Sequence, residues 1–216
     1  MVQKSKLGVS AVVLFVAIVL LVAAGTASWL WQTSGQRSPE PPQPALPRLT
    51  EFQLTGADGE EFRSEQLVGK VWVASYFFAQ CGGNCRMLNM ELVRLQRDYG
   101  PQGLHFVSMT CDPKNDSPQV LDNYADLLNA DQRSWAFLTG EMDYLKRIGS
   151  DLVELPVSER AHHTQITVVD RTGTPRGTFD VVIPRDLKRA KEIIEKLLAE
   201  PSSGDKPQVA RAPRDT

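Results

Sequence analysis

Two cysteines separated by three residues are the part of this sequence best suited to chemistry. Cys81 and Cys85 stand in "CGGNC", between an apolar segment and a segment whose leucines recur at helical spacing. Positions i and i+4 of a helix are neighbours, so both thiols would lie on one side. A helix N-terminus stabilises the thiolate, which binds metals and attacks disulfides. The pair suits a structural disulfide, a redox couple, or two ligands of a soft ion such as copper(I) or zinc.

A third ligand would have to come from elsewhere, and histidine is scarce. His162 and His163 are adjacent in "SERAHHTQITVVD", at the start of a predicted strand. Neighbouring strand residues point to opposite faces, so only one of the two would reach a given site. Two thiols and one imidazole would make a three-coordinate site suited to copper(I). The alternative interpretation is two solvated loop histidines. His105 lies in a predicted buried strand and is expected to pack there.

The segment "MTCDPKNDSPQVLDNYA" follows another predicted strand, where open α/β sheets carry ligand sites. Its simplest interpretation is structural: Asp112 begins a turn with the proline after it, and Asp116 or Ser117 caps a helix. Cys111 is expected to be a small buried hydrophobe. It is the third of three cysteines, so pairing any two leaves one over. Two methionines on the helix after the cysteines are expected to fill the core, Met87 and Met90.

The elements that must position these residues alternate between strand and helix. Strands are predicted in "KVWVASYFF", "LHFVSMT" and "WAFLTG", with hairpins in "FQLTGADGEEF" and in "TQITVVDRTGTPRGTFD", the latter turning at Thr172-Gly173. Helices are predicted from the cysteines to Gly100-Pro101, from Ser117-Pro118, in "MDYLKRIG" ending at Gly149, and across residues 187–198. This order predicts an α/β domain of thioredoxin-like fold over residues 49–200, with a mixed central β-sheet and helices on both faces.

The N-terminus indicates export. Lys4 and Lys6 precede an uncharged segment, residues 7–31, that exceeds the roughly 20 apolar residues needed to cross a bilayer. Lysines on the short side favour keeping that end in the cytoplasm. Residues 1–32 are therefore predicted to be a single transmembrane helix that anchors an exported domain in the membrane. A signal peptide cleaved after Gly25 and Ala27 is the alternative. Disulfides persist in such exported compartments.

The flanking segments differ from the domain in composition. Residues 33–48 are rich in proline and predict a semi-rigid linker, and residues 201–216 predict a disordered tail. The formal net charge of −2 gives no electrostatic reason to expect nucleic acid as a partner.

The ordered combination resembles the Sco/SenC family of copper-binding assembly proteins over residues 50–198. The resemblance rests on the N-terminal anchor and on three segments, "GKVWVASYFFAQCGGNC", "CDPKNDSPQVLDNYA" and "AHHTQITVVDRTG". It implies copper, as Cu(I) or Cu(II), bound by Cys81, Cys85 and one histidine. A gapless match to the "VVD" of residues 168–170 selects His162, with His163 as the alternative ligand.

The resemblance also implies a function. That function is delivery of copper to the dinuclear Cu-A centre of cytochrome c oxidase, or reduction of the cysteines there. The partner would be subunit II of the oxidase or another copper acceptor. An exported thiol-disulfide oxidoreductase that needs no metal is the alternative, although such motifs usually have two residues between the cysteines. A peroxide-reducing thiol enzyme of related fold is a third. Gly82 and Arg86 stand where the family commonly has proline.

Overall fold

The computed structural model describes residues 14–22, 24–26 and 50–201, and the chain divides into two units, residues 1–47 and 48–216. In the first unit, residues 14–22 and 24–26 are helical. No helix within the described ranges has both the length and the apolar character that a membrane span requires. Most of the predicted anchor lies outside the described residues, as do nearly all of the predicted linker and tail.

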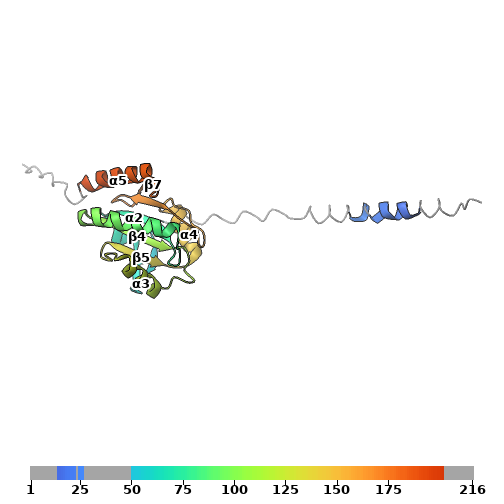
Figure 1. The fold of residues 1–216 in the computed structure, drawn as a ribbon, viewed down its shortest axis with the longest axis horizontal. Coiled ribbons are helices and arrows are strands. Elements are labelled where there is room, and N and C mark those ends of the chain that lie inside the picture. Colours follow the sequence, from blue (N-terminus) through green and yellow to red (C-terminus); the bar gives the residue numbers. More distant parts are fainter. Residues whose placement is uncertain (1–13, 23, 27–49, 202–216) are drawn as a thin grey trace, which may run out of the picture. The chain divides into compact units, whose positions relative to one another are not determined.

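The second unit contains a seven-stranded mixed sheet of order β2-β1-β5-β4-β3-β6-β7 (Figure 1). The central strands β3, β4 and β5 run parallel, and the remaining neighbours pair antiparallel. The strands are β1 (Gln53–Gly56), β2 (Glu61–Arg63), β3 (Val71–Phe77), β4 (Leu104–Thr110), β5 (Trp135–Thr139), β6 (Gln165–Val169) and β7 (Pro175–Asp180). The predicted mixed sheet and both predicted hairpins are confirmed.

Helices cover both faces of this sheet, as predicted. One core lies beneath three helices, α2 (Asn84–Tyr99), α3 (Pro118–Leu128) and α5 (Pro184–Ala199). A second core lies on the opposite face, beneath α4 (Met142–Asp151). Short 3-10 turns, η1 (Ser64–Leu67) and η2 (Gly100–Gln102), follow β2 and α2. The result is the thioredoxin-like layering that the order of elements predicts.

Strand β3 leads into the cysteines and is buried along its whole length. Successive side chains of a strand point to opposite faces, so β3 serves both cores. Val71, Val73 and Phe77 face the core of α2, α3 and α5, whereas Trp72, Ala74 and Tyr76 face that of α4. Burial on two faces explains why this strand reads as a continuous apolar run rather than as an alternating pattern.

Two predictions about the helices are wrong. Helix α4 does not end at Gly149 but continues to Asp151. A Cβ atom at Gly149 would lie 2.6 Å from the Leu155 carbonyl oxygen, so this glycine permits a close approach of two segments rather than ending the helix.

Met87 and Met90 do not fill the core, because 48% and 47% of their surfaces are exposed. The buried face of α2 is formed instead by residues such as Leu88, Leu92 and Leu95.

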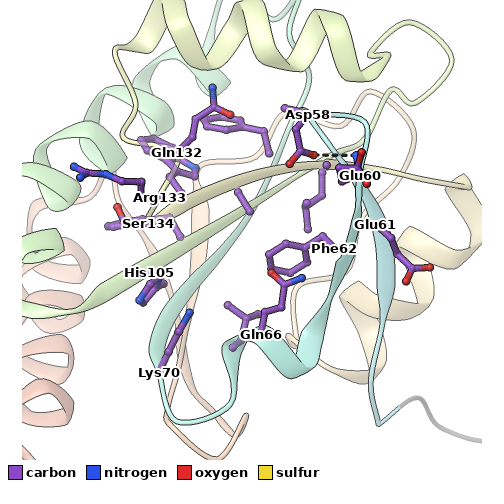
Figure 2. A pocket seen from close by; sticks show the side chains of 18 residues that line it. Asp58, Glu60, Glu61, Phe62, Gln66, Lys70, His105, Gln132, Arg133 and Ser134 are labelled. Atoms are coloured by element: carbon purple, nitrogen blue, oxygen red, sulfur yellow. Dashed lines mark hydrogen bonds between the residues drawn. The ribbon is translucent and has the colours of Figure 1, made fainter.

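His105 lies in β4 as predicted, at the end of the strand far from Cys111, and it is half-buried. It lines a pocket of about 310 Å³ whose wall also contains Lys70 and Arg133 (Figure 2). Burial, and secondarily the charge of Lys70, lower the pKa of His105. This pocket is separate from the cysteines, which lie beyond the other end of β3.

Candidate metal centre

The two cysteines of "CGGNC" lie on either side of the start of α2. Cys81 lies in a turn after β3, in which its backbone N–H donates to the Phe78 carbonyl oxygen at 3.1 Å. Helix α2 begins at Asn84, so Cys85 is its second residue. The segment between the cysteines is therefore not helical throughout. The turn nevertheless brings the two thiols together at the end of the buried strand.

Three side chains predicted from the sequence meet here. The Nδ1 atom of His162 lies 3.3 Å from the Sγ atom of Cys81. One ligand atom from each of Cys81, Cys85 and His162 lies within 4.8 Å of the others. Cys85 is fully buried, Cys81 is 7% exposed, and His162 is exposed, so the group opens to solvent on the histidine side. All three cysteines are free thiols. The group could hold a metal ion.

The environment of Cys85 favours the protonated thiol. Burial, followed by a hydrogen bond with the Cys81 thiol, raises the pKa of Cys85 to about 12, although a hydrogen bond with the Phe78 backbone acts in the opposite direction. A thiol that binds a metal must first lose its proton. Metal binding at this group would therefore be coupled to proton release.

His163 lies apart from the thiols. Its ring contacts Tyr76, with 6.0 Å between the ring centroids, and its Nε2 atom is buried without a hydrogen-bond partner in the described part of the chain. Burial, and then the charge of His162, lower the pKa of this imidazole. Both histidines precede β6 rather than lying in it, yet their rings still diverge. Among the described residues, the group that could hold a metal contains His162 and not His163.

Cys111 is buried beyond the end of β4, as expected of a small hydrophobe. Its thiol donates a hydrogen bond to the Ala161 carbonyl oxygen at 3.5 Å, and burial raises its pKa to about 12. It does not belong to the group formed by Cys81, Cys85 and His162.

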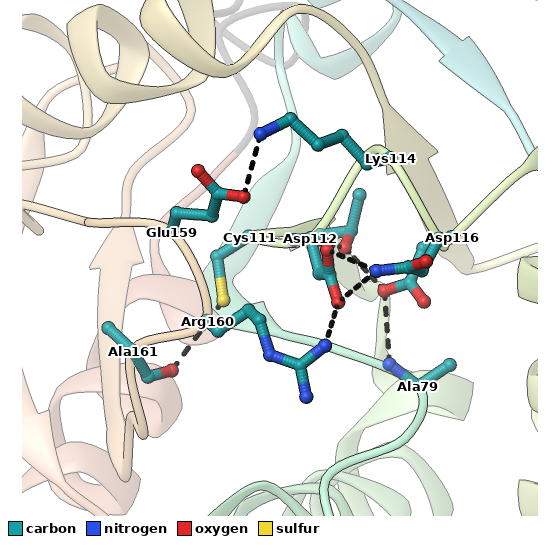
Figure 3. Close-up of polar contacts among 10 residues, drawn as sticks. Ala79, Cys111, Asp112, Lys114, Asp116, Glu159, Arg160 and Ala161 are labelled. Carbon is teal, nitrogen blue, oxygen red and sulfur yellow. Dashed lines mark hydrogen bonds and ion pairs between the residues drawn. The ribbon is translucent and has the colours of Figure 1, made fainter.

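The segment after Cys111 contributes two buried carboxylates that sequence reasoning assigned to a turn and a cap. Ser117 does cap α3, accepting from the backbone N–H of Val120 at 3.4 Å. Asp116 instead points inward, and one of its oxygens accepts from the backbone N–H of Ala79 at 3.0 Å and from Thr110 Oγ1 at 2.5 Å (Figure 3). Asp116 thus holds the turn that carries Cys81. The sequence around Asp116 does not indicate this role, because Ala79 lies after β3 and Thr110 lies in β4.

A groove of about 670 Å³ extends from Cys81 between α2 and α3. Arg86, in the first turn of α2, lines it together with Met90 and Leu127. Arg86 is exposed and forms no ion pair in the described part of the chain.

The fold and this group define a thioredoxin-like protein with a Cys-Cys-His cluster that could hold a metal. The chain belongs to the SCO1/SenC family, whose family model matches residues 41–199.

Individual relatives share the fold at low identity. The "SCO1 protein homolog" of Bacillus subtilis (strain 168) is 30% identical over 91 residues, which are 41% of this chain and 47% of that relative; the match therefore spans about half of its length. The solved structure of BsSco, described as a member of the Sco family of cytochrome c oxidase assembly proteins, is 20% identical with a TM-score of 0.63, over 71% of this chain and 95% of its own. Yeast Sco1 with copper bound is 24% identical with a TM-score of 0.54, over 77% and 97%.

Proposed function

We propose that this protein binds copper as a cargo through Cys81, Cys85 and His162 and delivers it during assembly of the Cu-A centre of cytochrome c oxidase. The observation that carries the proposal is the placement of the three ligand atoms within 4.8 Å of one another. Thiolate and imidazole ligands suit copper, and thiolates in particular suit copper(I). The copper-bound yeast Sco1 structure and the description of BsSco as a member of a family of oxidase assembly proteins support it.

The exposure of the three proposed ligands is compatible with transfer of copper to another protein. Cys85 is fully buried, whereas His162 is exposed. Ligands of an acceptor protein would therefore approach from the histidine side and replace the donors of this chain one at a time. Cys81 and Cys85 would give up their protons when copper binds and take them back when it leaves. The acceptor would be subunit II of cytochrome c oxidase or another copper-binding protein.

The proposal includes a location outside the cytoplasm. Residues 1–32 would anchor the chain in the membrane, residues 33–48 would act as a spacer, and the domain of residues 49–200 would lie on the exported side, followed by the tail of residues 201–216. The support is the pair of lysines, Lys4 and Lys6, ahead of an uncharged apolar segment of sufficient length.

A second candidate function is thiol-disulfide exchange without metal. It is favoured by one observation: Cys81 and Cys85 are free thiols whose Sγ atoms lie within 4.8 Å of each other. In such a protein the thiols would reduce a partner's disulfide and become a disulfide themselves. His162 would have no ligand role there.

Copper(I) titration of the reduced full-length chain in detergent, against a chromophoric copper(I) chelator, separates the two candidates. We expect one copper per chain, loss of binding in Cys81→Ala and Cys85→Ala, and affinity lowered by at least about 10-fold in His162→Ala, since removing a ligand should cost no less than removing a group that supports one. His163→Ala is the matched control and should bind as the wild type does. Unchanged affinity in His162→Ala with loss in His163→Ala would reverse the assignment. Wild-type protein that binds no copper but reduces disulfides would support the second function.

A further inference from the structure

We propose that Arg160 is a positioning residue that holds the His162 ring beside Cys81 by anchoring residues 158–163 to the buried carboxylate of Asp112. Residues 158–163 are called the strap here. The inference rests on the proposed function, because it assumes that His162 serves as a ligand. Nothing in the local pattern of "SERAHH" points to this role, since Asp112 lies 48 residues earlier in the chain.

The strap is joined to the end of β4 by both backbone and side chains (Figure 3). The backbone N–H of Arg160 donates to the Cys111 carbonyl oxygen at 2.9 Å, and the Cys111 thiol donates to the Ala161 carbonyl oxygen at 3.5 Å. The Arg160 guanidinium donates through Nη1 to Asp112 Oδ2 at 2.8 Å. These contacts lie one and two residues before His162, so they determine where the histidine backbone can be.

The ion pair of Arg160 is buried on the side of the carboxylate. The Asp112 side chain is only 2% exposed, and its oxygens also accept from Asn115 Nδ2 at 2.9 and 3.0 Å. A buried carboxylate that loses its cation is left with an uncompensated charge, so this pair constrains the strap strongly. The neighbouring pair of Lys114 and Glu159 is 74% and 47% exposed, so it constrains the strap much less.

Arg160 also contacts the Phe78 ring, which in turn packs against the His162 ring. Its guanidinium carbon lies 5.0 Å from the centroid of the Phe78 ring, and the Phe78 centroid lies 5.4 Å from that of His162. Arg160 therefore contacts Asp112 and Phe78 at once, and Phe78 supports the imidazole whose Nδ1 atom faces Cys81. Since His162 is exposed, this packing restricts a ring that could otherwise rotate into solvent.

The backbone of Arg160 supports the same role. Its φ angle is +53°, in the left-handed region that residues other than glycine adopt at a cost. Glycine would relieve that cost but would remove both the ion pair and the contact with Phe78. The contacts of the arginine side chain offset the cost at this position.

A double-mutant cycle on the full-length chain tests the role, with copper(I) affinity measured against a chromophoric chelator. We expect Arg160→Ala to lower the affinity about 10-fold and the Arg160→Ala, His162→Ala double variant to bind no more weakly than His162→Ala alone. Arg160→Lys, which keeps the charge, should restore part of the loss. Independent, additive losses would overturn the proposal.

Glu159→Ala is the matched control, because it removes the exposed ion pair of the same strap. It should bind copper as the wild type does, and a loss as large as that in Arg160→Ala would show that Arg160 has no special role. If Arg160→Ala does not fold, Arg160→Lys and Arg160→Gln take its place, and the uncharged variant is expected to lose more affinity than the lysine variant.

A second measurement needs no metal. In the reduced, copper-free protein, nuclear Overhauser contacts between the His162 and Phe78 rings should be present in the wild type and in Glu159→Ala and lost in Arg160→Ala. Persistence of the contacts in Arg160→Ala would overturn the positioning role. Wild-type protein that binds no copper yet shows this difference would refute the proposed function while leaving the positioning of the ring established.

Discussion

The imidazole of His162 and the thiol of Cys81 are separated by 81 positions in the chain and by 3.3 Å in space. Cys81 follows the central strand β3, and His162 precedes β6, which pairs directly with β3. The antiparallel pairing of these two strands brings the end of one beside the start of the other. The candidate site is therefore a product of sheet topology.

Cys81 should be the first cysteine to react with an alkylating reagent in the reduced, copper-free protein. It is 7% exposed, whereas Cys85 and Cys111 are fully buried with pKa values raised to about 12. The thiolate is the reactive form, and reagent must also reach it. Peptide mass mapping after brief iodoacetamide treatment at neutral pH should place the label on Cys81. Earlier labelling of Cys111 would contradict its full burial, and urea-unfolded protein, labelled at all three cysteines, is the control.

Asp116→Asn should weaken both the fold and the site. The carboxylate accepts from the backbone N–H of Ala79 and from Thr110, and these contacts hold the turn before Cys81. We expect the free energy of unfolding to fall by about 1–3 kcal/mol, since the new amide would bury N–H donors where the Asp116 Oδ1 atom has no hydrogen-bond partner among the described residues. Urea denaturation measures this fall, and copper(I) titration should show weaker binding. Asp126→Asn, at an exposed position of α3, should change neither quantity; equal effects of the two changes would disprove a special role for Asp116.

Gly149→Ala should destabilise the domain without direct effect on the cysteines. The new Cβ atom would lie 2.6 Å from the Leu155 carbonyl oxygen and 3.2 Å from Tyr76 Oη. Backbone and a buried ring would have to shift, which costs about 1–3 kcal/mol in a packed core. Thermal or urea unfolding gives the value. A Cβ atom at Gly82 would meet nothing within 4 Å, so Gly82→Ala is the control for stability. A Gly149→Ala protein as stable as the wild type would exclude the close approach.

Stability of the reduced, copper-free protein should fall in alkaline solution. Burial raises the pKa of Cys111 from its ordinary value of 9.0 to about 12. Between those values the unfolded chain has lost the proton that the folded chain keeps, so unfolding is favoured as the pH rises. From about pH 8 to about pH 10 we expect a loss of about 1 kcal/mol from this thiol.

The Cys111→Val variant provides the comparison for that pH dependence, because valine fills similar space without an ionisable group. Its unfolding free energy, measured in urea over the same pH range, should fall less steeply than that of the wild type. Equal slopes for the two proteins would mean that Cys111 titrates normally in the folded state.

The sequence by itself determined the order of elements and the residues from which a site could be built. Alternating apolar runs and helical spacing predicted the strands and helices, and Ser117 and Gly173 carried local signals that the structure confirms, as a helix cap and as a turn with a φ angle of +81°. These features depend on neighbours within a few residues, which a sequence displays directly. The burial of Cys111 was also predictable. That Cys81, Cys85 and His162 bind copper stays a prediction.

Tertiary structure alone decided the rest, because the deciding contacts join segments far apart in the chain. Which of two adjacent histidines faces the thiols depends on the path of the strap, and that path depends on Arg160 reaching Asp112. Asp116 points inward and accepts from the backbone N–H of Ala79, which lies 37 positions earlier in the chain. The same reason applies to two residue types on helices. Helical spacing alone did not show that Met87 and Met90 face solvent. It also did not show that Gly149 permits the close approach of another segment.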